Sequence, residues 1–349
     1  MKNYRYYQNT QRKEIPIFFA SDDNYVPYMA VALNSLIKNA SKNFDYKIKI
    51  LTTGISEENM AKLKKMERPY VDIDFVDVKK SLSELKVDLH TRDYYTNTTY
   101  FRLFIPDLFP QYKKALYLDG DIVVKGDISK FYNINIGNRL VGAITDEAVS
   151  AVPEFVEYVE KCLGMPSARR YFNAGILIMN LHQFRKQNFI GQFTDLLEKY
   201  KFTVAQDQDY LNVVCKNKVF YISNVWNKMP LDTPNFDKSK VQLIHYNLSF
   251  KPWKLDNILY EEHFWEEAKE TEYYDFIKSV KDNYPLELKE KTVQQTEALK
   301  SAALLEARSP VNYYKLYVEP TENGGQSGEG NLFDLELNLE IDETSPAKI

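Results

Sequence analysis

Short apolar runs alternate along the chain with segments whose apolar residues recur at helical spacing. Residues 15–20 form an uninterrupted apolar run, which predicts a buried strand. The next apolar positions recur three or four residues apart and predict an amphipathic helix: Val26, Met29, Leu33, Leu36 and Ile37. A second strand is predicted at 47–53, followed by a polar helix at 57–66 for which Ser56 is a suitable N-cap.

The same alternation continues as far as about residue 222. Further apolar runs predict strands at 71–76, 115–118, 140–145, 175–179 and 219–222. Helical patterns are predicted at 100–109, 152–162, 189–200 and 209–215. This order favours an α/β fold with a doubly wound, mostly parallel central sheet flanked by helices. Sheets of this kind bind ligands at the carboxyl ends of their strands.

The pattern changes near residue 284. Residues 1–284 are predicted to form one α/β domain, and 285–318 a small helical extension dominated by a helix at 286–308. From 319 to 349 the chain is acidic and rich in Gly, Glu and Asn, which predicts a flexible tail. Four apolar residues in it alternate with polar ones, a period that fits docking on another chain or a solvated end: Leu335, Leu337, Leu339 and Ile341.

Composition narrows the functional classes. The formal net charge of −4 gives no electrostatic case for binding nucleic acid, which requires a strongly basic face. Cys162 and Cys215 lie far apart without metal-ligand spacing, so reduced thiols are expected. No apolar run approaches the roughly 20 residues of a membrane span. These features predict a cytoplasmic protein without a transmembrane segment, with peripheral attachment at the inner membrane face as the alternative.

The candidate chemistry starts at Asp119-Gly120-Asp121, which lies between the apolar runs 115–118 and 122–124. Two carboxylates at the end of a buried strand need a partner, and a divalent cation such as Mg²⁺ or Mn²⁺ is a suitable one. The alternative is a carboxylate pair that caps a helix or turn. Because Asp22, Asp23 and Asn24 follow the first strand, the two acidic clusters are expected at equivalent strand ends.

Six motifs occur in order along the chain. They are 19–25 (FASDDNY), 99–102 (TYFR), 116–121 (LYLDGD), 171–177 (YFNAGIL), 207–209 (DQD), and His245-Tyr246 with Lys251-Pro252-Trp253. Over roughly residues 14–270 this set resembles glycosyltransferase family 8, retaining enzymes of the GT-A fold that include bacterial lipopolysaccharide α-galactosyltransferases. The resemblance implies a GT-A fold, a UDP-sugar donor and a divalent cation, usually Mn²⁺, with Mg²⁺ as the second choice.

The resemblance also implies roles for single residues. Asp119, Asp121 and His245 match the metal ligands of the family, with Gly120 between the aspartates. The other matching positions contact the nucleotide (Asp22, Asn24, Tyr25), the sugar and diphosphate (Arg102), the diphosphate (Lys251), the donor sugar (Asn173, Asp207), the anomeric carbon (Gln208) and the acceptor (Asp146). Gln208 and Asp207 are the expected catalytic residues, and a side chain at Gly175 would intrude on the bound donor. Four have a structural alternative, namely an N-cap for Asn24 and Asp207, a surface salt bridge for Arg102 and a packing role for Gly175.

The chain departs from the family pattern at two places. Leu248 stands where a glycine is expected in the turn between His245 and Lys251, so a different backbone is expected there. The tail is acidic, whereas the lipopolysaccharide enzymes carry a basic, aromatic C-terminus, so docking on a membrane through the tail is not expected.

The resemblance implies metal-dependent transfer of glucose or galactose from a UDP-sugar to a glycan or glycoconjugate acceptor, with α stereochemistry. Because Gln208 is a poor nucleophile, front-side attack is expected rather than double displacement. One alternative is a catalytically weak UDP-sugar-binding protein of the same fold. A sugar-1-phosphate nucleotidyltransferase is less favoured, because residues 21–24 are acidic and contain no glycine. No pattern assigns the donor hexose or the oligomeric state.

Overall fold

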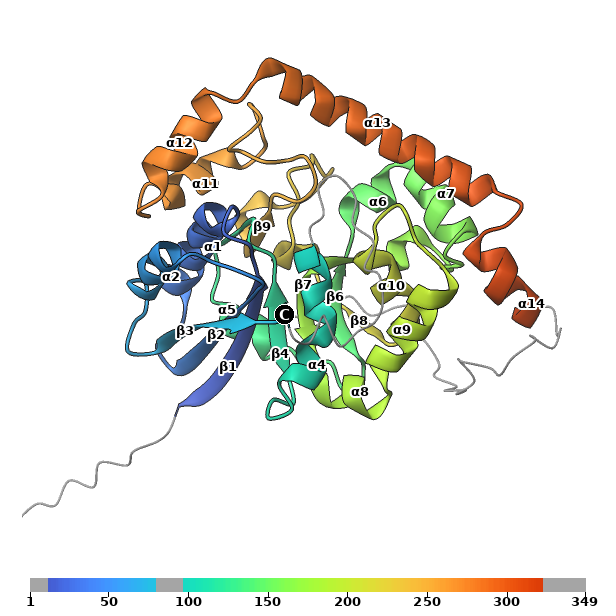
Figure 1. The fold of residues 1–349 in the computed structure, drawn as a ribbon, viewed down its shortest axis with the longest axis horizontal. Coiled ribbons are helices and arrows are strands. Elements are labelled where there is room, and N and C mark those ends of the chain that lie inside the picture. Colours follow the sequence, from blue (N-terminus) through green and yellow to red (C-terminus); the bar gives the residue numbers. More distant parts are fainter. Residues whose placement is uncertain (1–11, 80–96, 323–349) are drawn as a thin grey trace, which may run out of the picture.

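The computed structural model describes residues 12–79 and 97–322, which form a twisted seven-stranded sheet flanked by helices (Figure 1). The strand order is β3-β2-β1-β4-β7-β6-β8. The strands are β1 (Lys13–Ala20), β2 (Phe44–Thr52), β3 (Val71–Asp77), β4 (Ala115–Leu118), β6 (Val141–Thr145), β7 (Phe172–Met179) and β8 (Val219–Tyr221). Only the pairs that involve β7 are antiparallel, which confirms the predicted α/β fold with a mostly parallel sheet.

A second, two-stranded sheet pairs β5 (Ile122–Val124) with β9 (Leu243–His245). The α-helices described are α1 (Val26–Asn39), α2 (Glu57–Lys64), α4 (Ile105–Leu108), α5 (Ile128–Tyr132), α6 (Glu147–Ala151), α7 (Pro153–Lys161), α8 (Leu181–Lys186), α9 (Phe189–Lys199), α10 (Asp207–Val214), α11 (Glu261–Ala268), α12 (Tyr274–Asp282), α13 (Leu286–Arg308) and α14 (Glu319–Glu322). The 3₁₀ segments are η1 (Asn97–Phe104), η2 (Ala168–Arg170), η3 (Asn224–Trp226) and η4 (Lys238–Lys240), and η5 (Tyr314–Val318) is π-helical.

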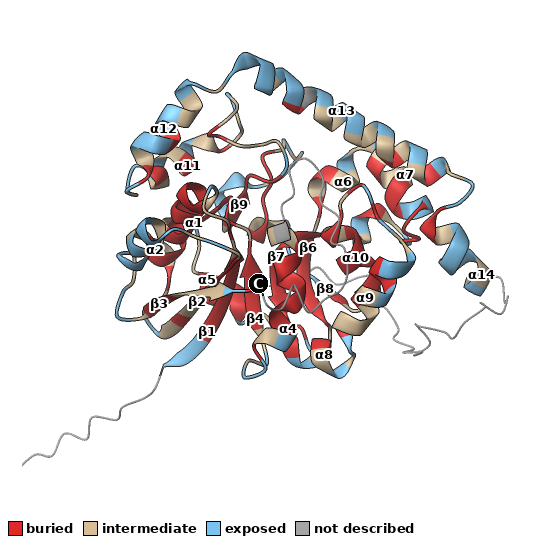
Figure 2. Cartoon of the chain, viewed as in Figure 1, coloured by how far each residue is buried: buried red, intermediate tan, exposed pale blue. Residues whose placement is uncertain are grey.

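Strand β1 shows why the centre of the sheet is apolar on both faces. Successive side chains of a strand point to opposite faces. Phe18 accordingly packs into the core on one face, while Ile17 and Phe19 pack into the core on the other. Helices cover both faces, so the central strands are buried (Figure 2). This two-sided burial explains the uninterrupted apolar run at 15–20.

Most predicted elements are present. The differences concern short segments and a segment that combines 3₁₀ and α-helical geometry. Ser56 caps α2 as predicted and accepts a hydrogen bond from the backbone N–H of Asn59 at 3.3 Å. The helix predicted over 100–109 is instead the 3₁₀ segment η1 followed by the single turn α4, which has Pro106 near its start. Strand β9 was not predicted, because three residues are too few to show a period.

The C-terminal extension lies across the outside of the α/β unit. Helix α13 runs from the neighbourhood of α12 to α7, where Ala303 and Ala307 are buried (Figure 1). The predicted flexible tail begins within α14, and its alternating segment 335–341 lies outside the described residues. Within residues 12–79 and 97–322, no helix combines the length and apolar character needed to cross a membrane.

Candidate active site

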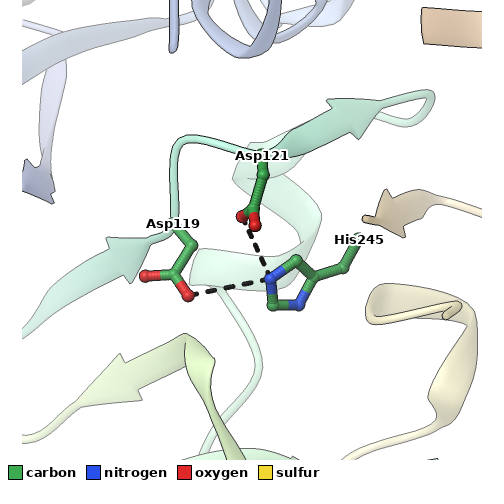
Figure 3. Close-up of side chains that lie close together, drawn as sticks. All are labelled: Asp119, Asp121 and His245. Atoms are coloured by element: carbon green, nitrogen blue, oxygen red, sulfur yellow. Dashed lines mark ion pairs between the residues drawn. The ribbon is translucent and has the colours of Figure 1, made fainter. Parts of the chain in front are cut away.

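The carboxyl end of β4 carries the candidate metal centre. The backbone N–H of Asp119 donates to the carbonyl of Gly175 at 2.8 Å, which holds this strand end against β7. The chain then turns through Asp121 into β5, where Ile122 pairs with His245 of β9. This pairing of β5 with β9 brings the imidazole beside both carboxylates, although it lies 124 residues after Asp121 in the sequence (Figure 3).

The three side chains form a compact set of possible metal ligands. His245 Nε2 lies 3.2 Å from Asp121 Oδ1 and 3.7 Å from Asp119 Oδ2, and one ligand atom from each residue falls within 4.8 Å of the others. His245 Nδ1 lies 2.8 Å from Oδ1 of Asn227. A proton on Nδ1 satisfies this amide oxygen, and the Nε2 lone pair then faces the two carboxylates.

The environment of His245 Nε2 fits a bound cation. The atom is buried and has no hydrogen-bond partner among the described residues, although two carboxylates lie close to it. A neutral imidazole and two carboxylates form a donor set that binds divalent transition metals, and Mn²⁺ and Mg²⁺ both accept carboxylate oxygens. The residues present therefore fit such an ion.

Gly175 leaves space for the centre itself. A Cβ atom at this position would lie 2.4 Å from Asp119 Oδ2 and 2.5 Å from His245 Cε1. Contacts this short would force the candidate metal ligands apart. The sequence predicts that this glycine makes room for the ligand or serves a packing role. The nearest atoms show that it makes room for the side chains that would hold the cation.

Lys251 extends into the same centre. Its ammonium pairs with Asp121 Oδ2 and donates to the carbonyl of Tyr246 at 2.7 Å. Burial raises the pKa of Asp121, but the neighbouring ammonium of Lys251 outweighs this effect and holds the pKa well below its ordinary value. Asp121 is therefore ionised, as a metal ligand must be.

The turn before Lys251 shows how the chain accommodates its departure from the family pattern. Leu248 adopts φ +50°, the left-handed conformation that glycine takes at little cost. Its side chain is 43% exposed. The conformation at this position is one that glycine favours, and the difference from the family backbone expected here stays a prediction.

Arg102 lies between two carboxylates and is almost fully buried. Its guanidinium is 3.2 Å from Asp119 Oδ1 and 3.1 Å from Asp207 Oδ2, and it stacks over the ring of Tyr117 at 4.4 Å. The alternative of a surface salt bridge is therefore wrong. Burial raises the pKa of Asp207 to about 6, against the opposing charge of Arg102. The N-cap position of α10 belongs to Gln206, so the capping alternative for Asp207 is also wrong.

Gln208 is held by groups from two other segments. Its Oε1 accepts from the backbone N–H of Ala174 at 2.9 Å, and its Nε2 donates to Asp146 Oδ2 at 3.2 Å. Asn173 Nδ2 donates to the same Asp146 oxygen at 3.0 Å. Asp146 also caps α6 through the N–H of Val149. The end of β6, the start of β7 and the first turn of α10 therefore meet at these polar side chains.

The turn after β1 holds the predicted nucleotide residues. Asp22 Oδ1 accepts from the backbone N–H of Tyr25 at 3.0 Å, and Asn24 is exposed. Tyr25 occupies the N-cap position of α1, so the capping alternative for Asn24 is wrong. The ring of Tyr25 lies 6.2 Å from that of Trp253. Burial and the nearby carboxylates of Asp121 and Asp119 raise the pKa of Tyr25.

Three groups at the site were not predicted from the sequence. Asn227 orients His245 but belongs to no motif, and only the fold identifies it. Tyr117 donates to Asp119 Oδ1 at 3.0 Å from within an apolar strand, where its hydroxyl gave no signal. Asp209 belongs to the DQD motif but had been given no role.

Asp209 ties the first turn of α10 to the surrounding structure. Its carboxylate accepts from the hydroxyls of Tyr171 at 2.7 Å and Tyr158 at 2.9 Å and from the backbone N–H of Ala205 at 2.9 Å. Burial raises the pKa of Asp209 to about 7, although these three donors oppose the shift. The residue therefore fixes the helix turn that presents Asp207 and Gln208.

Comparisons with known proteins agree with this geometry. The sequence model of Glycosyl transferase family 8 matches residues 16–257. A protein from Haemophilus influenzae described as a putative glycosyltransferase is 33% identical over 218 residues, which are 62% of this chain and 64% of that protein. General stress protein A of Bacillus subtilis is 26% identical over 257 residues, covering 68% of this chain and 86% of its own.

Two solved structures share the fold at 29% sequence identity. The bifunctional glycosyltransferase WbbM superposes with a TM-score of 0.67, covering 77% of this chain and 52% of that one. The galactosyltransferase LgtC, solved in complex with donor and acceptor sugar analogues, superposes with a TM-score of 0.62, covering 74% of this chain and 96% of its own.

Proposed function

Because the chain belongs to glycosyltransferase family 8, we propose that it transfers a hexose, glucose or galactose, from a UDP-sugar to a glycan or glycoconjugate acceptor with retention of the α configuration. The observation that carries the proposal is the buried Nε2 of His245, which faces Asp119 and Asp121 without a hydrogen-bond partner among the described residues. A divalent cation held there by these three residues would bind the diphosphate of the donor.

The charged residues around the centre suit a diphosphate. We propose that Asp119, Asp121 and His245 hold Mn²⁺, with Mg²⁺ as the second choice. When bound, the cation stabilises negative charge that develops on the departing UDP. Lys251 pairs with Asp121 in the structure, and its ammonium would be available to a phosphate oxygen when Asp121 holds the cation. Arg102 fixes the position of Asp119 from the opposite side.

The resemblance to the family supports positions for the nucleotide and the sugar. We propose that Asp22 and Asn24 bind the uridine with Tyr25 beside the base, and that Asn173 and Asp207 bind the hexose hydroxyls. Of these, Asn24 is exposed and Asp22 is only partly buried, as a ligand contact requires. Asp146, which contacts both Asn173 and Gln208, is proposed to lie near the acceptor. These contacts with the ligand are assigned by analogy with the family.

The residue closest to the reacting carbon in this proposal is Gln208, an amide. An amide oxygen is a weak nucleophile, whereas double displacement needs a carboxylate close to the anomeric carbon. We therefore propose front-side attack. The acceptor hydroxyl oxygen forms the new bond to the anomeric carbon as the bond from that carbon to the UDP oxygen breaks, and a phosphate oxygen of UDP takes the hydroxyl proton. Gln208, fixed by Ala174 and Asp146, orients the sugar.

A UDP-release assay tests the proposal. The protein is incubated with Mn²⁺ and with UDP-glucose, UDP-galactose or GDP-mannose, and product stereochemistry is read by NMR. We expect release from one UDP-hexose and loss of release in Asp121→Ala at saturating Mn²⁺. Wild-type activity in that variant would refute the metal assignment. A glycosyl adduct trapped on a carboxylate would replace front-side attack by double displacement.

The catalytically weak binding protein stays the second candidate. It predicts binding of UDP and Mn²⁺ in calorimetry without turnover of any UDP-sugar. The candidate metal ligands lie together and Gln208 is held in place, which are the features that turnover requires. We therefore favour the enzyme.

A further inference from the structure

Helix α13 lies beyond residues 16–257, the part of the chain that matches the family, yet both of its ends are attached to segments of the candidate site. At its N-terminal end, Lys289 Nζ lies 2.7 Å from Asp256 Oδ2, and Lys281 of α12 lies 2.8 Å from the other oxygen of Asp256. Asp256 directly follows a helical turn in which the N–H of Leu255 donates to the carbonyl of Lys251 at 2.9 Å. Lys281 of α12 also donates to the carbonyl of Leu255, so α12 and this end of α13 together hold the turn that carries Lys251.

The C-terminal end of α13 is attached to the opposite side of the site. Glu306 accepts from Thr203 Oγ1 at 2.6 Å and from the hydroxyl of Tyr200 at 3.1 Å. Arg308 forms two hydrogen bonds with Glu157 of α7, at 3.0 and 3.1 Å. The segment 200–206 leads directly into α10. This end therefore holds the residues that precede Asp207 and Gln208.

Between these attachments, α13 is one continuous helix of 23 residues, which spans about 34 Å at the rise of an α-helix. Gln294, Glu297 and Ala298 in its middle are exposed. In Figure 1 the helix bridges the two sides of the molecule, from α12 to α7. A helix is much stiffer than the loops at its ends, so it transmits position from one end to the other.

We infer that α13 is a brace that fixes the turn of Lys251 relative to the first turn of α10, and that Asp256 and Glu306 are positioning residues for sugar transfer. This inference rests on the proposed function, because it gives the helix a task in that reaction. Lys251 is the proposed diphosphate contact and Gln208 the proposed sugar contact, so their separation sets how the donor is held. Small displacements of such groups lower the rate of a reaction strongly.

The brace makes a prediction that separate local contacts do not. If one end is released, the helix no longer fixes the two segments relative to each other. Release of the second end should then lower kcat/KM little further. We expect Asp256→Ala and Glu306→Ala each to lower kcat/KM by about 1.5- to 5-fold, the range for one exposed pair. The kcat/KM of the double variant should be no lower than that of the less active single variant. Losses that multiply in the double variant would overturn the inference.

Two further variants complete the kinetic test. Glu297→Ala is the matched control, because Glu297 lies on the exposed side of α13 and, among the described residues, forms an ion pair only with Lys300 of the same helix. It should retain wild-type kcat/KM. Gln294→Gly combined with Ala298→Gly softens the middle of the helix and leaves both attachments in place. It should reproduce the loss seen in the single variants, and wild-type activity in it would refute the brace.

Hydrogen exchange of the full-length protein tests the brace without relying on turnover. We expect Asp256→Ala to accelerate amide exchange at the far end, in segment 200–206, and Glu306→Ala to do so in the turn 248–255. Acceleration confined to the end that carries the substitution would overturn the brace. A wild-type protein that turns over no UDP-sugar would instead contradict the proposed function, so the two failures are distinguishable.

Discussion

His245 Nδ1 lies 2.8 Å from Oδ1 of Asn227, while Nε2 of the same ring lies 3.2 Å from Oδ1 of Asp121. The amide thus fixes both the orientation of the imidazole and the position of its proton. A ligand-orienting partner of this kind contributes to metal affinity without touching the metal.

The first prediction concerns Asn227. Asn227→Ala leaves the ring of His245 free to rotate and its proton free to move to Nε2, so we expect the Kd for Mn²⁺ to rise about 10- to 100-fold. Isothermal titration calorimetry measures this change. Asn43→Ala, at an exposed loop position, serves as the control. An unchanged Kd in Asn227→Ala would show that the amide does not prepare the ligand.

The second prediction compares two glycines. Gly175→Ala places a Cβ 2.4 Å from Asp119 Oδ2, which must displace the candidate metal ligands. We expect a loss of about 1–3 kcal/mol in the free energy of unfolding from overpacking. We also expect at least about a 100-fold loss of metal-dependent transfer, since displacement of about 1 Å has that effect. Gly54→Ala is the matched control, because a Cβ there meets nothing within 4 Å. Chemical denaturation and the UDP-release assay measure the two effects.

The third prediction concerns pH. Burial raises the pKa of Asp209 from 3.8 to about 7, so the folded protein binds this proton more tightly than the unfolded chain. The stability from this group is complete below pH 3.8 and is lost as pH rises towards about 7. Each unit of pKa shift corresponds to at most about 1.4 kcal/mol in the free energy of unfolding.

A thermal-unfolding series from pH 4 to pH 8 of wild type and Asp209→Asn checks this effect. The amide mimics the protonated carboxyl and does not titrate. We therefore expect the Tm of the wild type, relative to that of the variant, to fall as pH rises through this window. Parallel curves would contradict the raised pKa.

The fourth prediction concerns Leu248. An L-residue in the left-handed conformation costs about 1–2 kcal/mol, and a glycine at this position removes that cost. The greater conformational freedom of glycine in the unfolded chain offsets part of the resulting gain in stability. We expect Leu248→Gly to raise the free energy of unfolding by about 1 kcal/mol. Leu248→Ala removes the same exposed side chain but keeps Cβ, so it should give no gain. Equal effects of the two substitutions in urea denaturation would show that the backbone is not strained.

Most of the order of strands and helices could be predicted before the structure, because apolar periodicity reports which faces a segment buries. The sequence also identified Asp119 and Asp121 at a strand end, since acidic residues after a buried strand are visible without knowledge of the fold. The predicted helix at 100–109 failed because the pattern of buried residues there does not distinguish 3₁₀ from α geometry.

Periodicity does not show which distant side chains meet; the family resemblance implied the grouping of His245 with Asp119 and Asp121, and the folded chain shows the contacts that produce it. The three-residue pairing of β5 with β9 brings His245 to Asp121, and the path of the chain places Asn227 behind the imidazole. The close approach of β4 to β7 explains Gly175, whose missing side chain leaves space for Asp119. These contacts depend on the packing of segments far apart in the sequence, and local periodicity carries no information about that packing.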